Sequence, residues 1–233
     1  MQTLTSTHAH STPKIARTHT LPLRETGPAD HLEIDEVTTG KQQAVKRILR
    51  YVAGTFDYGL HYPRSPGAEH FIGYSDSDLA GDIDNSKSTT GTLFFLGKCL
   101  VSWQSIKQQV VALSSCEAEY IAATTASTQA LWLAQLLGDL LGKEAQAVEL
   151  RVDSKSVLAL AKNPVFHERS KHIRIKYHFI RSCLDEGSIK ADYINTQDQL
   201  ADLLTKSLGR VKFQEMCARI GMAQIPQKAS HKT

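Results

Sequence analysis

The sequence predicts an α/β domain in which a mixed five-stranded sheet, with its three antiparallel strands first, is flanked by helices. Three extended segments follow one another between residues 71 and 103, and they indicate the antiparallel part of the sheet. A long helical segment comes next, between residues 114 and 141. Two further extended segments then alternate with helical ones, which is typical of sheets that combine strands with covering helices.

Residues 1–40 precede this pattern and are rich in Thr, Ser, His and Pro, without apolar periodicity. We expect them to form a disordered segment, or one foreign to the domain that follows. From Lys41 onward, apolar residues recur with the period of an amphipathic helix, and Gly54 is a suitable end for it. The apolar stripe consists of Val45, Ile48, Leu49 and Val52.

The three antiparallel strands are predicted from β-branched and aromatic residues that are bounded by turn residues. They are FIGYSD (71–76), GTLFFLG (91–97) and CLVSW (99–103). Gly97 and Lys98 predict a tight turn between the second strand and the third. The run QVVAL, which ends at Leu113, predicts a further extended segment before the long helix.

Ser114-x-x-Glu117 is a capping box, and it predicts that the long helix begins there and runs to about Leu141. VELRV (148–152) predicts a short buried strand, which is followed at once by a helix over SVLALAKN. The large aromatic residues along these segments are expected in the core rather than on a base-stacking surface. They are Trp103, Tyr120 and Trp132.

The last third of the chain contains one more predicted strand and three more predicted helices. The first helix is indicated by an apolar stripe of Ile173, Tyr177, Ile180 and Leu184. A strand follows over SIKADYI (188–194), and Thr196-x-x-Gln199 predicts the cap of a helix over DQLADLLTK. The final amphipathic segment carries Phe213, Met216, Cys217 and Ile220 on one side.

The composition is that of a soluble globular protein, with 41% hydrophobic and 22% charged residues in 233. This length allows one medium domain with extensions, but not two ordinary enzyme domains. Four cysteines far apart, without a CxxC pair, argue against a zinc knuckle and a disulfide framework, and favour reduced thiols in an intracellular protein, in the cytoplasm or nucleus. No segment approaches the length of a membrane span, so we expect no membrane partner.

Four acidic residues stand where their side chains could reach the same end of the predicted sheet. Asp76 lies in the first strand and Glu119 in the first turns of the long helix, while Asp153 follows the fourth strand and Asp202 lies in a late helix. A lone acid after a strand is more often a cap or a turn residue than a ligand. The order of these acids along successive elements is much more specific than any one of them.

Two alternatives remain open among these acids. Asp78 could replace Asp76, because strand alternation puts both on the same face. Glu117 could replace Glu119, although Glu117 is explained as the capping-box partner of Ser114.

From about Lys41 to Met222 the sequence resembles the polyprotein of copia-type long-terminal-repeat retrotransposons, at the end of its reverse transcriptase and through its ribonuclease H domain. The matching words, in the order and spacing of the family, are AVKRILRYVAGTFDYGL, GYSDSDLAGD, KSTTGTLFFLG, VSWQSIKQQVVALSSCEAEYIA, VDSKSVLALAKNPVFHERSKHIRIKYHFIR and DQLADLLTK. They cover almost all of the chain beyond the N-terminal segment.

The resemblance implies a ribonuclease H-like fold and an active site of four acids, which fall on Asp76, Glu119, Asp153 and Asp202. These carboxylates would bind two Mg²⁺ ions, with Mn²⁺ as a substitute, because hard divalent ions prefer oxygen ligands. Two ions about 3.5–4 Å apart can bracket a scissile phosphate. The implied reaction is hydrolysis of the RNA strand of an RNA–DNA hybrid, which leaves 5′-phosphate and 3′-hydroxyl ends.

Two groups of residues are candidates for binding the hybrid. A basic stripe at helical spacing suits either a phosphate backbone or an ordinary solvated face, and it consists of Lys171, Arg174, His178 and Arg181. A polar turn after the first strand could donate hydrogen bonds to phosphate or ribose, or simply make the turn, and it contains Lys87, Ser88, Thr89 and Thr90. Contacts to the 2′-hydroxyl are expected from backbone groups near Ser77 and side chains near Glu119.

The resemblance also implies the organisation of the chain. Residues 41–66 correspond to a remnant of the reverse transcriptase C-terminal connection, residues 67–209 to the ribonuclease H-like domain, and residues 210–233 to a C-terminal helix and tail. Two functions are therefore weighed. The first is a metal-dependent nuclease acting on RNA–DNA hybrid, with a reverse transcriptase in trans as a second candidate partner. The second is an inactive or repurposed remnant that binds nucleic acid or a protein.

Overall fold

The computed structural model describes residues 31–63, 70–162 and 174–225. The chain divides into two compact units between Phe56 and Asp57. The first unit contains α1 (His31–Thr55), which includes the predicted apolar stripe and ends beside Gly54, but begins at His31 rather than near Lys41. Within the described ranges, no helix combines the length and the apolar character that crossing a membrane requires.

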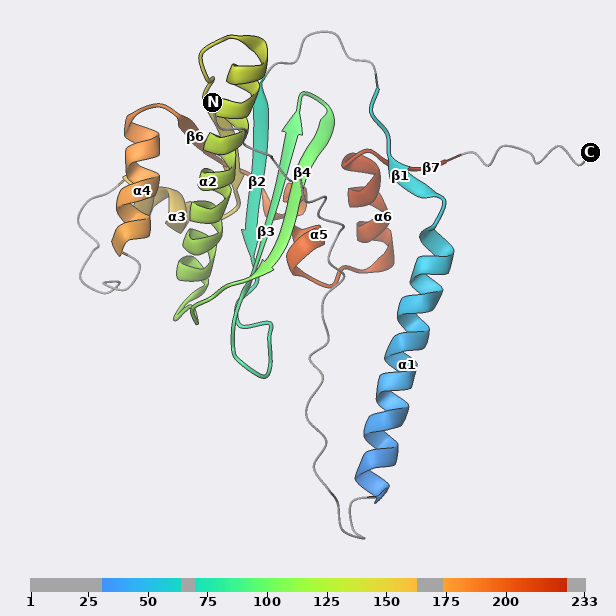
Figure 1. The fold of residues 1–233 in the computed structure, drawn as a ribbon. Helices are drawn as coiled ribbons and strands as arrows, with labels where there is room; N and C mark the ends of the chain where they lie inside the picture. The colour runs from blue at the N-terminus through green and yellow to red at the C-terminus, as the bar shows by residue number, and fades with distance from the viewer. Residues whose placement is uncertain (1–30, 64–69, 163–173, 226–233) are drawn as a thin grey trace, which may run out of the picture. The chain divides into compact units, whose positions relative to one another are not determined.

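The second unit is built on a five-stranded sheet with the order β4-β3-β2-β5-β6 (Figure 1). β2, β3 and β4 are antiparallel neighbours, whereas β5 and β6 run parallel to β2. The predicted fold class is therefore confirmed, including the position of the three antiparallel strands at the start. The strands are β2 (Phe71–Ser77), β3 (Thr89–Leu96), β4 (Cys99–Lys107), β5 (Val148–Val152) and β6 (Ile189–Tyr193).

Helices cover the sheet on both faces, and each face has its own hydrophobic core. Figure 1 shows α2 along one face, with α3 and α4 on the same side and α5 and α6 on the other. Alternation along β2 and β3 divides their side chains between the two cores, because Phe71 and Phe94 pack with α2 whereas Tyr74 and Leu93 pack with α5 and α6. The helices are α2 (Ser115–Leu141), α3 (Lys155–Lys162), α4 (Arg174–Asp185), α5 (Asp202–Thr205) and α6 (Arg210–Arg219).

The turns that join the antiparallel strands follow the predicted chemistry. Leu96 and Cys99 are paired across the β3–β4 turn, and Gly97 adopts a φ of 60°, which glycine reaches without steric cost. Ser114 caps α2 as predicted, since its side chain accepts a hydrogen bond from the Glu117 backbone N–H at 3.2 Å. The predicted start of the long helix and its serine cap are therefore confirmed, whereas the Glu117 side chain does not return to the Ser114 backbone N–H.

A small second sheet was not predicted. It pairs β1 (Tyr58–Leu60) with β7 (Met222–Gln224) in antiparallel register, so both ends of the described part of this unit meet. Three residues on each strand are too few to produce a readable alternation in the sequence.

The expectations for two segments are wrong. QVVAL is not extended in the sheet, because β4 ends at Lys107 and the chain enters α2 through an irregular segment. Thr196 does not cap a helix over residues 198–206. A 3₁₀ turn, η3 (Thr196–Asp198), takes its cap from the Asn195 side chain instead, and α5 is only four residues long. Short segments of this kind obtain their shape from the elements they pack on, which local sequence patterns do not report.

The aromatic residues expected in the core divide into two groups. Tyr120 is fully buried in the core between α2 and the sheet. Trp103 and Trp132 are exposed, which contradicts the prediction for both. Trp103 lies on β4, which is an edge strand of the five-stranded sheet.

Candidate active site

Three of the predicted acids meet at one end of the sheet. Ser75 on β2 is in parallel register with Val152 on β5, so Asp76 and Asp153 follow at the same carboxyl end of adjacent strands. Glu119 reaches them from the second turn of α2. One oxygen atom from each of these three carboxylates lies within 4.8 Å of the others. Asp76, Glu119 and Asp153 thus form one acidic cluster.

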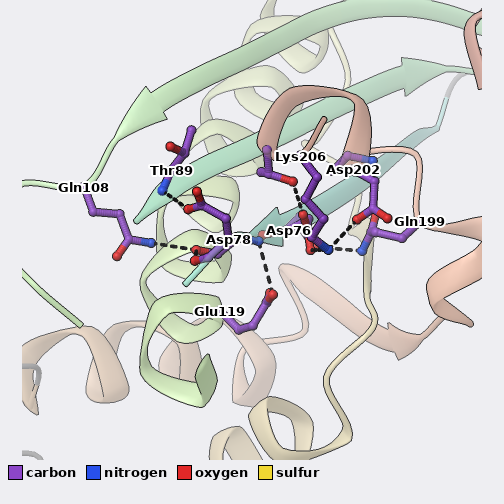
Figure 2. Close-up of polar contacts among 12 residues, drawn as sticks. Asp76, Asp78, Thr89, Gln108, Glu119, Gln199, Asp202 and Lys206 are labelled. Atoms are coloured by element: carbon purple, nitrogen blue, oxygen red, sulfur yellow. Dashed lines mark hydrogen bonds and ion pairs between the residues drawn. The ribbon is translucent and has the colours of Figure 1, made fainter. Parts of the chain in front are cut away.

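The Glu119 carboxylate is held against the end of β2. The Ser77 backbone N–H donates a hydrogen bond of 3.2 Å to Glu119 Oε1. Figure 2 shows Glu119 and Asp76 at this end of the sheet. Glu119 Oε2 is buried and has no hydrogen-bond partner among the described residues. Burial, followed by the charges of Asp76 and Asp153, raises the pKa of Glu119 to about 9. A carboxylate in this environment requires a cation before it can carry its full charge near neutral pH.

Asp153 titrates in the same direction as Glu119. Burial raises its pKa, and the charge of Asp76 adds to the effect, whereas Lys206 and a hydrogen bond with Thr196 oppose it. Thr196 belongs to η3, in the segment that follows β6, so this segment also helps to orient the cluster. Ser154, the next residue, caps α3 through a 3.2 Å hydrogen bond from the Val157 backbone N–H.

Asp202 adjoins the cluster through a lysine. It is the first residue of α5, and its Oδ1 lies 2.8 Å from Lys206 Nζ, which is in turn 3.3 Å from Asp76 Oδ1. Thr205 donates its hydroxyl to the other Asp76 oxygen. Burial is the largest influence that raises the pKa of Asp202 to about 6, and the pKa of Lys206 is raised by its two carboxylate partners. The structure therefore places the fourth predicted acid beside Asp76, with Lys206 between them.

A glycine on β3 allows α5 to approach this closely. Gly91 is paired with Asp76 in the sheet register. A Cβ at Gly91 would lie 2.8 Å from the Ala201 carbonyl oxygen, 2.8 Å from Thr205 Cγ2 and 3.0 Å from Leu204 Cβ. The absence of a side chain at Gly91 thus sets the distance between the sheet and the segment that carries Asp202 and Thr205.

We expect Gly91→Ala to move α5 away from Asp76. Overpacking of this kind costs about 1–3 kcal/mol of folding stability. A displacement near 1 Å at a catalytic group can cost about 10²-fold in rate. Urea unfolding and hybrid cleavage by the same preparation measure both effects. Gly209→Ala is the matched control, because a Cβ at Gly209 meets no atom within 4 Å. Its cleavage rate should stay within about twofold of the parent chain, and its stability should fall by no more than about 1 kcal/mol, since Gly209 is the N-cap of α6. Equal effects of the two substitutions would contradict this account of α5.

The geometry distinguishes between the two pairs of alternative acids. Asp76 is 0% exposed and belongs to the cluster, whereas Asp78 lies beyond the end of β2 and accepts a hydrogen bond from the Thr89 backbone N–H. Glu117 accepts a 3.0 Å hydrogen bond from the Leu113 backbone N–H, one residue before the position that a capping box requires. Asp78 and Glu117 thus have roles in a turn and at a helix terminus.

The candidate hybrid-binding residues are distributed unevenly over the described structure. Ser88 is 1% exposed and its hydroxyl accepts a 3.1 Å hydrogen bond from the Ala80 backbone N–H, so its contacts are those of a turn residue. Lys87 and Thr89 are partly exposed, but the expected polar turn ends at Ser88, because Thr89 and the buried Thr90 are the first two residues of β3. Arg181 is partly exposed on α4, whereas Lys171 and the Arg174 side chain lie outside the described residues. The Ser77 backbone N–H already donates a hydrogen bond to Glu119, so in this structure it is not available for the expected contact with a ribose 2′-hydroxyl.

Two functional positions, Thr205 and Lys206, were missed by the sequence analysis. Both belong to the word DQLADLLTK, and Lys206 is four residues after Asp202, the spacing at which helical side chains become neighbours. The sequence therefore contained a signal for the contact between Lys206 and Asp202. It contained no signal for the contacts of Thr205 and Lys206 with Asp76, because 129 and 130 positions separate these residues from Asp76.

We expect Lys206→Met to destabilise the metal-free protein. Removing one partner of a buried ion pair costs about 3–5 kcal/mol. The Lys206 side chain is 38% exposed, however, and solvent screening reduces the expected loss to about 1 kcal/mol. Thermal unfolding in a chelator measures this loss, which should shrink at saturating Mg²⁺ because the ion then supplies the positive charge. A loss that is unchanged by Mg²⁺ would contradict the placement of Lys206 at the cation site.

The residues present fit a hard divalent cation. They offer carboxylate oxygens from β2, α2 and the end of β5, which is the ligand chemistry that Mg²⁺ and Mn²⁺ use. Glu119 Oε2 has no hydrogen-bond partner among the residues that the structure describes, so it is open to a cation, and the Lys206 ammonium already supplies positive charge at Asp76. The cluster could therefore hold a metal ion.

The sheet order, the helices on both faces and the acidic cluster at the carboxyl ends of β2 and β5 define a ribonuclease H-like domain. Among solved structures, the chain is similar to the ribonuclease H1 from compost called LC11-RNase H1. The TM-score is 0.45 and the identity 21%, over 59% of this chain and 93% of that one. No family model matches the chain.

The chain is homologous to a segment of the retrovirus-related Pol polyproteins of copia-type transposons, which confirms the resemblance found in the sequence. It is 41% identical over 184 residues, 79% of its length, to the Pol polyprotein from transposon RE1 of Arabidopsis thaliana. It is 44% identical over 179 residues, 76% of its length, to that from transposon TNT 1-94 of Nicotiana tabacum. The matched segments are only 12% and 13% of these two polyproteins.

Proposed function

We propose that this chain is a metal-dependent endonuclease that hydrolyses the RNA strand of RNA–DNA hybrids. The observation that carries the proposal is the convergence of Asp76, Glu119 and Asp153 within 4.8 Å, with Asp202 joined to Asp76 through Lys206. Homology to Pol polyproteins supports the same reaction class, since these acids lie in the words that carry the resemblance. The domain responsible is proposed to be residues 67–209, with residues 41–66 a remnant of the reverse transcriptase connection.

Each carboxylate is oriented by groups of this chain before a substrate binds. Thr205 and Lys206 hold the two oxygens of Asp76, the Ser77 N–H holds Glu119, and Thr196 contacts Asp153. Bound Mg²⁺ ions, two in the proposed complex and replaceable by Mn²⁺, would supply an acidified water and neutralise the charge that develops on the departing ribose oxygen. Preorganised acids need little rearrangement during the reaction, which is the part of catalysis that the fold provides.

Hybrid binding is proposed to rest on basic and polar groups outside the cluster. Positively charged side chains near the phosphates give affinity without sequence preference. Ser88 is too buried to contribute directly and is proposed to shape the turn that presents its neighbours. The proposed contacts are Lys87, Thr89, Lys171, Arg174 and Arg181.

The test is incubation of the purified chain with a hybrid labelled on either strand, in Mg²⁺, beside the Asp153→Asn variant. We expect RNA fragments with 5′-phosphate ends from the parent chain, and at least about 10³-fold fewer from the variant. DNA strands and double-stranded DNA should remain intact. Absence of cleavage by the parent chain in both Mg²⁺ and Mn²⁺ would overturn the proposal and favour a remnant that only binds.

A further inference from the structure

We propose that two buried glutamines, Gln108 and Gln199, are positioning residues that fix the acid-bearing elements on either side of Asp76. The inference rests on the proposed function, because it assigns these residues to the same cation site. Figure 2 shows Gln108 and Gln199 on opposite sides of Asp76, each reaching towards the end of β2. Neither residue belongs to the acidic cluster, and no ionisable group is needed for the role proposed.

Gln108 connects β2, β3 and α2 at one point. It is 4% exposed, and its Nε2 lies 3.1 Å from Ser77 Oγ, 3.1 Å from Thr90 Oγ1 and 2.9 Å from the Ala118 carbonyl oxygen, so its two N–H groups are shared among three acceptors. Ala118 directly precedes Glu119. Ser77, in turn, donates its backbone N–H to the Glu119 carboxylate. Gln108 therefore fixes both the helix turn that carries Glu119 and the strand residue that binds it.

Gln199 makes the equivalent connection on the other side. It is 0% exposed, and its Nε2 donates to the Ser75 carbonyl on β2 at 2.8 Å. Its Oε1 accepts a 3.3 Å hydrogen bond from the Ala201 backbone N–H, directly before Asp202. The amide thus fixes the start of α5 to the residue that precedes Asp76. Because α5 has only four residues, it has little structure of its own to hold Asp202 in place.

The two amides bind residues on either side of Asp76. Gln199 is bound to Ser75 and Gln108 to Ser77, so the three residues at the end of β2 connect both acid-bearing segments. A buried amide is costly unless its groups are hydrogen-bonded, and Gln108 Oε1 has no partner among the described residues. An apolar side chain at either position would leave a buried carbonyl, that of Ser75 or Ala118, without this hydrogen bond. The directional hydrogen bonds of each amide therefore fix the register between β2 and an acid-bearing segment.

The proposal predicts weaker cation binding when either amide is removed. Substitution of residues that orient metal ligands typically lowers metal affinity by about 10–100-fold. We expect Gln108→Met and Gln199→Met each to raise the Kd for Mn²⁺ about tenfold, measured by calorimetry on the full chain without nucleic acid. Methionine keeps the length of the side chain and removes its hydrogen bonds.

A matched control is available on the same helix that carries Glu119. Gln129 lies further along α2 and its Nε2 donates to Ser102 Oγ on β4 at 3.2 Å, so it also joins α2 to the sheet, but away from the acids. Gln129→Met should leave the Kd for Mn²⁺ within about twofold of the parent chain, whatever its effect on urea unfolding. If Gln129→Met weakens Mn²⁺ binding as much as Gln108→Met does, general destabilisation explains the effect and the proposal is overturned.

Double-mutant cycles distinguish positioning from a structural role. In a Glu119→Gln background, Gln108→Met should weaken Mn²⁺ binding by less than about twofold, because the carboxylate that it positions is already gone. Gln199→Met should behave in the same way in an Asp202→Asn background. Full tenfold effects in both backgrounds would overturn the proposal. If a methionine variant does not fold, Gln108→Asn and Gln199→Asn replace it, since the shortened amide cannot span its partners and the same weakening is expected.

Cleavage of hybrid by the parent chain is measured in parallel and separates this proposal from the proposed function. If both glutamine variants lose Mn²⁺ affinity but the parent chain does not cut RNA, the positioning role stands and the nuclease function fails. If the parent chain cuts RNA and the glutamine variants bind Mn²⁺ normally, the function stands and the positioning role is overturned. A parent chain that binds no Mn²⁺ overturns both.

Discussion

Asp76→Asn should abolish cleavage of RNA in the hybrid, with a loss of at least about 10³-fold in the single-turnover rate. Metal-assisted charge stabilisation contributes several kcal/mol, and each unit of about 1.4 kcal/mol changes the rate tenfold. Asp76 is the common neighbour of the other acids, since it belongs to the cluster with Glu119 and Asp153 and shares Lys206 with Asp202. The substitution keeps the shape of the side chain but removes the charge that binds the cation.

Asp78→Asn is the matched control for Asp76→Asn, because the same substitution is made two residues away. Asp78 accepts the Thr89 backbone N–H and lies outside the cluster, so its loss should affect the turn rather than the cation site. We expect a rate within about fivefold of the parent chain. A complete loss with Asp78→Asn, together with retained cleavage in Asp76→Asn, would show that the first acid of the site has been assigned to the wrong residue.

Glu119→Gln should abolish cleavage and, at the same time, stabilise the metal-free protein. The pKa of Glu119 is about 9 in the folded chain, above its ordinary value of 4.5, chiefly because the carboxyl is buried. Between these two pH values the folded state binds more protons at this site than the unfolded state, so stability falls as pH rises. Glutamine removes this loss. Substitutions that relieve strain in an active site commonly contribute about 0.5–2 kcal/mol.

The pH dependence separates this effect from ordinary repacking. In a chelator, the melting temperature of Glu119→Gln should exceed that of the parent chain at pH 8 by about 2–6 °C, since 1 kcal/mol shifts Tm by about 2–4 °C at this size. The difference should vanish near pH 4, where Glu119 is protonated in both states. It should also shrink when Mg²⁺ is added at pH 8, because the cation stabilises the parent carboxylate. A difference that is constant from pH 4 to pH 8 would contradict the origin proposed for it.

The strands and long helices of this fold could be predicted because their signals are local. β5 occupies the predicted residues 148–152, and α2 begins at its capping serine. The predictions failed where tertiary contacts decide the structure. The segment after β6 forms a 3₁₀ turn and a single turn of helix instead of one capped helix, because Gln199 and the approach to Gly91 fix it to the sheet.

The acids of the candidate site could be listed from the sequence, but their relations could not. Family resemblance indicated Asp76 and Glu119, and the structure shows why Asp78 and Glu117 differ from them, through hydrogen bonds that serve a turn and a helix terminus. Lys206 contacts Asp202, four residues away, and Asp76, 130 positions away. Only the contact with Asp202 could be predicted from the spacing in the sequence. Gln108 and Gln199 carry no charge, and their proposed positioning role depends on their burial beside β2, which the sequence does not indicate.

The most direct test of the central claim is a crystal structure of the chain with Mn²⁺ and a hybrid, with the ions located by anomalous scattering. We expect two anomalous peaks about 3.5–4 Å apart at the carboxyl ends of β2 and β5. Their protein ligands should be oxygens of Asp76, Glu119, Asp153 and Asp202, with Lys206 displaced from between Asp76 and Asp202. Manganese bound elsewhere, with the cluster free of anomalous density and Lys206 still in place, would contradict it.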